Sequence, residues 1–377
     1  MGCRASLRSK ACRTATDRAN AGRLDLRKKC TVSTVTRSSD LTAAEAFKRR
    51  PLSPLQRVQR VLHRHPEISP LVVLVIAAIA FQFTNDRFLL PSNLSLILQQ
   101  VSIIGALAAG QTLVILTAGI DLSVGALMIF VSMVMGFLAG LAGVPGPWAF
   151  AIGIGVGAAA GLINGVLVAQ VKLPPFITTL GMLSVFTALA LLMTNGQSVN
   201  GEKLGDFLTW TSTSFPVGPF QLTVGVALVI AMYLALGFAL SQTAWGKHVY
   251  AVGSDPQAAR LSGVSTKRVL LSVYVVAGVL VALSAWVLIG RNNAATTSAA
   301  VDVNLDSITA VVIGGTSLFG GRGRLLGTFL GAVTVGFFRN GLSLARVDVL
   351  YQTLAIGLLI IAAVALDQWI RRTGATR

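Results

Sequence analysis

The sequence predicts an all-α integral membrane protein with about ten transmembrane helices. Only 12% of its 377 residues are charged and 54% are hydrophobic, whereas a soluble domain usually has about 25% charged residues. Apolar blocks long enough to cross about 30 Å of hydrocarbon follow one another along most of the chain. The Lys and Arg residues between these blocks are concentrated on alternate sides, which is typical of multi-pass membrane proteins.

The polar segments between the ten apolar blocks differ greatly in length. Only AGIDLS lies between the second and third blocks, and the longest polar segment follows the sixth. The eighth block is the weakest, because it is short and rich in glycine, and we expect it either to cross the membrane or to re-enter it. In chain order the blocks cover residues 69–85, 94–118, 122–143, 148–171, 176–194, 218–241, 269–290, 305–319, 325–343 and 349–367.

Basic residues set the expected orientation. Residues 1–66 hold 16 of the 31 Lys and Arg but only four acids. A basic segment beside a membrane span usually stays in the cytoplasm, and we favour this reading over nucleic-acid binding. With ten crossings the outer segments have mixed charge, and the following basic residues lie inside: Lys172, Lys247, Arg260, Lys267, Arg268, Arg322, Arg324, Arg371, Arg372 and Arg377. We therefore expect both termini in the cytoplasm.

Two domains are expected: a basic cytoplasmic tail, residues 1–66, and a transmembrane domain, residues 67–372, with a cytoplasmic loop at 243–268. Residues 1–40 are basic, poor in acids and without an apolar run. They are either a disordered extension or the result of a start site assigned too far upstream. All three cysteines lie in this tail, so the sequence predicts neither a disulfide framework nor a cysteine metal site.

Glycine spacing predicts one close helix contact. Gly153, Gly157, Gly161 and Gly165 recur at every fourth residue of the fourth block, and that spacing lets another backbone approach closely. In addition, GIDLSVG at 119–125 and GTSLFGG at 315–321 share the frame G-x-x-L-x-x-G. This faint echo is compatible with two related halves, as in many transporters.

The polar residues singled out within the apolar blocks are mostly uncharged. Gln100, Gln111, Thr178 and Thr179 are our candidates for lining a solute path, because amides and hydroxyls suit a neutral, hydroxyl-rich solute. The alternative is that these side chains only form hydrogen bonds between helices. The sequence leaves both interpretations open.

Catalytic motifs are lacking in the sequence. The nearest approach to a phosphate-binding P-loop, GTSLFGGR, lacks the Lys-Ser/Thr pair that such a loop needs. We predict no catalytic residue and no metal ligand, which argues against an integral membrane enzyme. With no evident coupling charge in the spans, the energy for any transport must come from outside this chain.

The longest polar loop contains a short predicted helix, in the stretch VGSDPQAARLSG. Asp255 is a good N-cap and Pro256 suits the first helical position, while Gly263 is a plausible end. Two turns are too short to be stable alone in water. We therefore expect the helix to dock against a separate motor subunit.

From about Leu71 to Arg372 the chain resembles the permease subunit of bacterial ABC importers for simple sugars, the ribose/xylose/galactose-type family. Five ordered motifs carry the resemblance: GQTLVILTAGIDLSVGA at 110–126, LPPFITTLGML at 173–183, NGQSV at 195–199, WGKHVYAVGSDPQAARLSGVSTKRV at 245–269 and AVVIGGTSLFGGRGRLLGTFLGA at 310–332. The first motif contains the family-motif residues Gly119, Asp121, Leu122, Ser123 and Gly125.

The resemblance implies a multi-pass protein of the bacterial inner membrane that works as a pair of identical subunits. Two cytoplasmic ATPase subunits would bind ATP and Mg, so that this chain needs no cofactor, and a periplasmic binding protein would deliver the sugar. Permeases for another small solute, such as an autoinducer, a nucleoside or a branched amino acid, remain the alternative. The family's coupling loop to the ATPase maps onto Ala251, Gly253, Asp255, Pro256, Ala258, Ala259, Arg260, Leu261 and Gly263.

Overall fold

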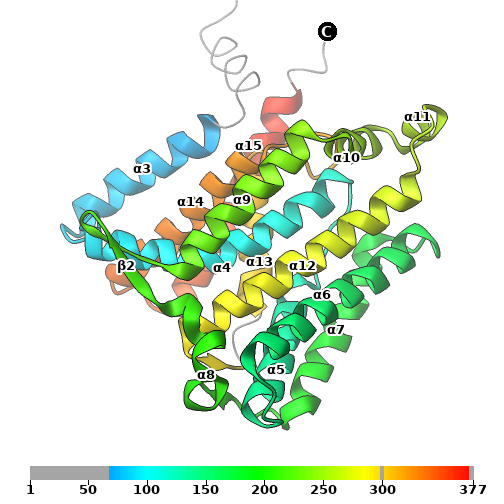
Figure 1. The fold of residues 1–377 in the computed structure, drawn as a ribbon. Helices are drawn as coiled ribbons and strands as arrows, with labels where there is room; N and C mark the ends of the chain where they lie inside the picture. The colour runs from blue at the N-terminus through cyan, green and yellow to red at the C-terminus, as the bar shows by residue number, and fades with distance from the viewer. Residues whose placement is uncertain (1–67, 298–300, 373–377) are drawn as a thin grey trace, which may run out of the picture. The chain divides into compact units, whose positions relative to one another are not determined.

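A computed structural model describes residues 68–297 and 301–372; the predicted tail, 1–66, lies outside them. Ten apolar helices dominate these residues, and each overlaps one predicted apolar block, in the same order (Figure 1). They are α3 (Ile68–Thr84), α4 (Pro91–Leu116), α5 (Val124–Gly140), α6 (Gly146–Ala169), α7 (Pro175–Thr194), α9 (Val224–Gln242), α12 (Thr266–Asn292), α13 (Val301–Ile313), α14 (Leu325–Leu344) and α15 (Val349–Arg372).

Short elements occupy the segments between these helices. They are β1 (Val199–Asn200), α8 (Gly201–Thr209), η1 (Trp210–Ser212), β2 (Ser214–Val217), β3 (Phe220–Thr223), α10 (Ala244–Ser254), α11 (Pro256–Leu261) and β4 (Ala294–Ala295). The antiparallel pairs are β1 with β4 and β2 with β3. The hairpin β2–β3 explains why α9 begins later than the predicted block 218–241: Phe220–Thr223 is extended, and the Thr223 side chain caps the helix.

Six of the described helices, α4, α6, α7, α9, α12 and α14, are long and apolar enough to cross a membrane, whereas α3, α5, α13 and α15 contain shorter apolar stretches. The 13 residues of α13 extend about 20 Å at 1.5 Å per residue. This is less than the hydrocarbon thickness of about 30 Å, in keeping with the weakness of the eighth block. Ten crossings, and both termini inside, stay predictions.

The helix contacts follow a repeated pattern. α12 packs against α6, and in the same way α4 packs against α14. α5 contacts α6, α7 and α12, whereas α13 contacts the matching helices α14, α15 and α4. The four helices α4–α7 thus correspond to α12–α15. GIDLSVG, 119–125, leads into the start of α5, whereas GTSLFGG, 315–321, follows the end of α13. The two G-x-x-L-x-x-G segments therefore do not occupy equivalent positions in this repeat.

Glycines at every fourth residue of α6 allow a close helix contact, as their spacing predicts. The partner is α12, and the two helices lie side by side in Figure 1. A Cβ added to Gly157 would lie 2.6 Å from the carbonyl oxygen of Gly278, and one added to Gly161 would overlap the carbonyl oxygen of Tyr274. Only glycine permits this backbone separation. The predicted contact is confirmed.

Candidate functional site

The segment between α4 and α5 carries the family-motif residues and is folded around one carboxylate. Asp121 is buried, and its Oδ1 accepts hydrogen bonds from the Ser123 amide at 2.7 Å and from the Ser123 hydroxyl at 2.6 Å. Burial raises the pKa of the Asp121 carboxyl, while hydrogen bonds from Ser123 and Asn164 oppose that rise. We call residues 119–125 the motif segment.

Two of the predicted solute-path residues bind the backbone of the motif segment. The Gln111 amide, oriented to satisfy its hydrogen bonds, donates to the Asp121 carbonyl at 3.1 Å and accepts from the Asp121 amide at 3.2 Å. The Thr179 hydroxyl donates to the Ile120 carbonyl at 3.1 Å and accepts from the Leu122 amide at 3.0 Å. Side chains from α4 and α7 thereby satisfy backbone N–H and C=O groups of the motif segment that would otherwise need hydrogen bonds from water.

Two asparagines hold the motif segment from the other helices. Asn164 of α6 donates to the Ser123 hydroxyl at 3.1 Å. Asn304 of α13 accepts from the Gly125 amide at 2.9 Å and donates to the Leu122 carbonyl. Neither asparagine was among the sequence candidates for this site. Asn304 lies at the edge of the weakest apolar block, and its polar side chain is the only feature of the sequence that could have indicated a role.

The other two path candidates lie apart from this cluster. The Thr178 hydroxyl donates to the Pro174 carbonyl of its own helix at 3.2 Å. Gln100 is half-buried on α4, eleven residues before Gln111, or about 16 Å along a helix. The structure brings together Gln111 and Thr179 but not the full set. Their assignment to a solute path stays a prediction.

The predicted polar helix forms as α11. The Asp255 carboxylate accepts from the amides of Gln257 at 2.8 Å and Ala258 at 3.0 Å, and Pro256 is the first helical residue. Gly263 has φ +84°, and the Val264 amide donates to the Ala259 carbonyl at 3.0 Å, the pattern of a glycine-terminated helix end. The predicted N-cap and end are therefore confirmed.

Exposure separates the roles of the residues on α11. Ala259 is buried among core residues of its own chain, so its contact is internal. Leu261 is 90% exposed, and Ala258 and Arg260 are exposed beside it. Leu261 is the large apolar side chain that α11 presents at the surface. Docking of this loop to a partner stays a prediction.

Backbone contacts link this loop to α4. The Gly321 amide donates to the Leu116 carbonyl, the last of α4, at 2.9 Å. A Cβ on Gly253, near the end of α10, would overlap that carbonyl oxygen and lie 2.7 Å from the Gly321 amide nitrogen. The Tyr250 hydroxyl also donates to the Gly323 carbonyl at 2.9 Å. We call Gly253, Leu116 and Gly321 the glycine junction.

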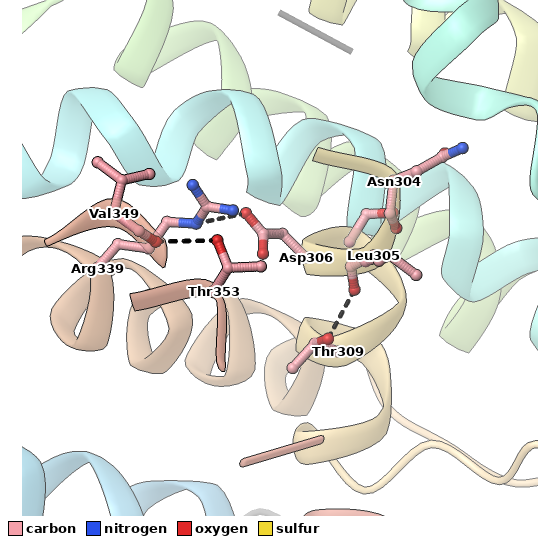
Figure 2. Close-up of polar contacts among 8 residues, drawn as sticks. Asn304, Leu305, Asp306, Thr309, Arg339, Val349 and Thr353 are labelled. Atoms are coloured by element: carbon pink, nitrogen blue, oxygen red, sulfur yellow. Dashed lines mark hydrogen bonds and ion pairs between the residues drawn. The ribbon is translucent and has the colours of Figure 1, made fainter. Parts of the chain in front are cut away.

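The apolar helices also contain an ion pair that was not predicted from the sequence. Asp306 of α13 and Arg339 of α14 face one another, with Arg339 Nε 2.7 Å from Asp306 Oδ2 (Figure 2). Each residue falls inside a predicted apolar block. Two opposite charges in neighbouring blocks could therefore have predicted an ion pair. Among the described residues no group of three or more His, Cys, Asp or Glu side chains could hold a metal ion.

Comparison with known proteins identifies the family. Residues 93–364 match the family described as the permease component of the branched-chain amino acid transport system. The fructose import permease protein of Rhizobium meliloti is 46% identical over 85% of this chain and 90% of its own length.

Two further relatives are also sugar permeases by name. The ribose import permease protein of Bacillus subtilis is 37% identical over 83% of this chain and 97% of its own. The D-allose transport system permease protein of Escherichia coli is 36% identical over 80% and 91%. The chain therefore belongs to this family of transport permease components, and it is a multi-pass protein of the bacterial inner membrane.

Proposed function

We propose that this chain is the membrane-spanning permease subunit of an ABC importer that takes up a monosaccharide. The observation that carries the proposal is the 46% identity to a fructose import permease across 85% of the chain. Relatives named for ribose and allose, at 37% and 36% identity, support the same solute class. The uncharged Gln and Thr side chains near the motif segment suit a neutral solute.

In this proposal two copies of the chain form the pore, and a separate cytoplasmic ATPase binds and hydrolyses ATP. The capped helix α11, with Leu261 exposed, supports a role as the ATPase contact. Through the glycine junction this contact reaches the end of α4, which holds Gln111 and thus the motif segment. A periplasmic binding protein supplies the sugar.

Reconstitution tests the proposal. The chain is purified with the ATPase and binding protein of its importer, and proteoliposomes are assayed for ATP-dependent uptake of radiolabelled D-fructose, D-ribose and D-allose. We expect uptake of at least one sugar, and none with a hydrolysis-deficient ATPase variant. L-leucine is the comparison solute, because the family description names branched-chain amino acids. Uptake of leucine without uptake of any sugar would contradict the proposal.

A further inference from the structure

Arg339 is the one charged residue in α14. An ionised side chain within a membrane helix is costly, so such residues nearly always face the interior of the helix bundle or a water-filled path. The Arg339 side chain is 34% exposed in the single chain, and so is only partly covered by protein. The exposed part of the Arg339 side chain is therefore expected to face something other than lipid.

Asp306 holds the guanidinium in place. The side chain of Asp306 is 2% exposed, and its Oδ2 lies 2.7 Å from Arg339 Nε; Figure 2 shows the two side chains pointing toward each other from α13 and α14. The pair carries no net charge. Because the carboxylate lies on the buried side, the exposed part of the pair is the cationic part.

The ion pair belongs to the same framework as the motif segment. Asp306 is two residues after Asn304, which binds the Gly125 amide and the Leu122 carbonyl. The short helix α13 thus joins Arg339 to the segment that Gln111 also holds.

Arg339 lies far along α14 from the loop that the charge pattern places in the cytoplasm. α14 begins at Leu325, two residues after Gly323, whose carbonyl accepts a hydrogen bond from Tyr250 of that loop. Arg339 follows Leu325 by fourteen residues, or about 21 Å of helix. In the orientation expected from the charge pattern, this is the outer half of the protein, which a solute delivered from outside would meet first.

We propose that Arg339 contacts the transported solute in the outer half of the path and that Asp306 is its positioning residue. This inference depends on the proposed function and its orientation. A guanidinium has five N–H donors in a planar fork, and the hydroxyl oxygens of a neutral sugar can accept from it. An anionic solute or a lipid phosphate would add an uncompensated negative charge beside Asp306, so a neutral polyhydroxyl compound fits better.

A double variant that removes both charges tests the proposal. Asp306→Asn with Arg339→Gln removes both charges of the ion pair, and the fully assembled importer is assayed with whichever of D-fructose, D-ribose and D-allose the wild type takes up. We expect normal assembly and ATPase stimulation by sugar-loaded binding protein. Sugar moved per ATP hydrolysed should fall about tenfold or more, as for loss of a hydrogen bond to a charged group. Arg346→Gln, an exposed arginine beyond α14, is the control.

Wild-type sugar uptake per ATP in the double variant would overturn the proposal, as would a loss explained wholly by a lower yield of complex. If the wild-type importer moves none of the sugars, it is the proposed function that fails.

A second variant leaves the ion pair intact. Thr353 of α15 is drawn beside the pair in Figure 2, and α15 packs on both α13 and α14. Thr353→Cys, in a chain whose three native cysteines are serine, should react with a membrane-impermeant thiol reagent from outside. Sugar-loaded binding protein should slow that reaction. Resistance to the reagent, labelling unaffected by sugar, or a disulfide between two copies at this position would each contradict a solute contact here.

Discussion

Asp121 shows how a single residue can organise a site. Its carboxylate is buried and accepts two hydrogen bonds from Ser123, which fold the motif segment into a tight turn. Gln111 then binds both main-chain polar groups of Asp121. Because a buried carboxylate is costly unless it is hydrogen-bonded, the residue types at positions 111, 121 and 123 depend on one another.

The raised pKa of Asp121 predicts a pH dependence of stability. Because burial raises this pKa above its ordinary 3.8, the folded chain binds the proton more tightly than the unfolded chain does. Stability should therefore increase as pH falls through the raised pKa, and level off below 3.8. The thermal unfolding temperature of the purified protein, measured over a series of pH values, tests this increase.

Asp121→Asn should abolish this pH-dependent increase, whereas Asp206→Asn, at an exposed position, should retain it. An unchanged increase in the Asp121→Asn protein would assign the effect to another group.

At the scale of elements, the loop helix is stabilised from within and also contacts its neighbours. Its N-cap, glycine end and buried Ala259 need no partner subunit. A helix of two turns would be unstable alone, but contacts with the rest of the chain stabilise it. The sequence of the loop alone does not show these contacts. The glycine junction then connects the loop to α4 through backbone atoms, without a flexible side chain between them.

Gly253→Ala should uncouple ATP hydrolysis from uptake. The added Cβ would overlap the Leu116 carbonyl oxygen, so α10 must shift away from the end of α4. We expect the assembled importer to hydrolyse ATP while sugar uptake falls to about a tenth or less, a loss worth about 1.4 kcal/mol or more. Sugar uptake and phosphate release are measured in the same proteoliposomes.

Gly237→Ala is the matched control, because a Cβ there meets nothing within 4 Å. If Gly253→Ala and Gly237→Ala transport sugar equally well per ATP, the junction has no part in coupling.

Across the whole described chain, packing relates α4–α7 to α12–α15. α4 ends at the glycine junction beside α10, while α12, which packs against α10, begins just after the loop. The two groups of helices therefore run in opposite directions relative to the loop 243–268, the arrangement of an inverted repeat. Such repeats place a solute path between their halves.

Ten crossings predict which side of the membrane each loop faces. In a chain with Cys3, Cys12 and Cys30 replaced by serine, Ser214→Cys in the hairpin and Arg346→Cys after α14 should react with an impermeant thiol reagent in intact spheroplasts. Ser262→Cys, after α11, should react only in opened membranes; all three positions are exposed. Labelling of the Arg346→Cys variant only in opened membranes would mean that α13 does not cross.

The sequence predicts the ten apolar helices, their order, a close helix contact at the α6 glycines and the ends of α11, because apolar blocks, glycine spacing and capping residues act over a few turns of the chain. It also carried the resemblance to sugar permeases. The fold alone shows that α12 is the partner of the α6 glycines, that four side chains meet at the motif segment, and that Asp306 pairs with Arg339. The four side chains are those of Gln111, Asn164, Thr179 and Asn304. These contacts join residues far apart in the chain, and hydrogen bonds and ion pairs between distant helices leave no periodic pattern in the sequence.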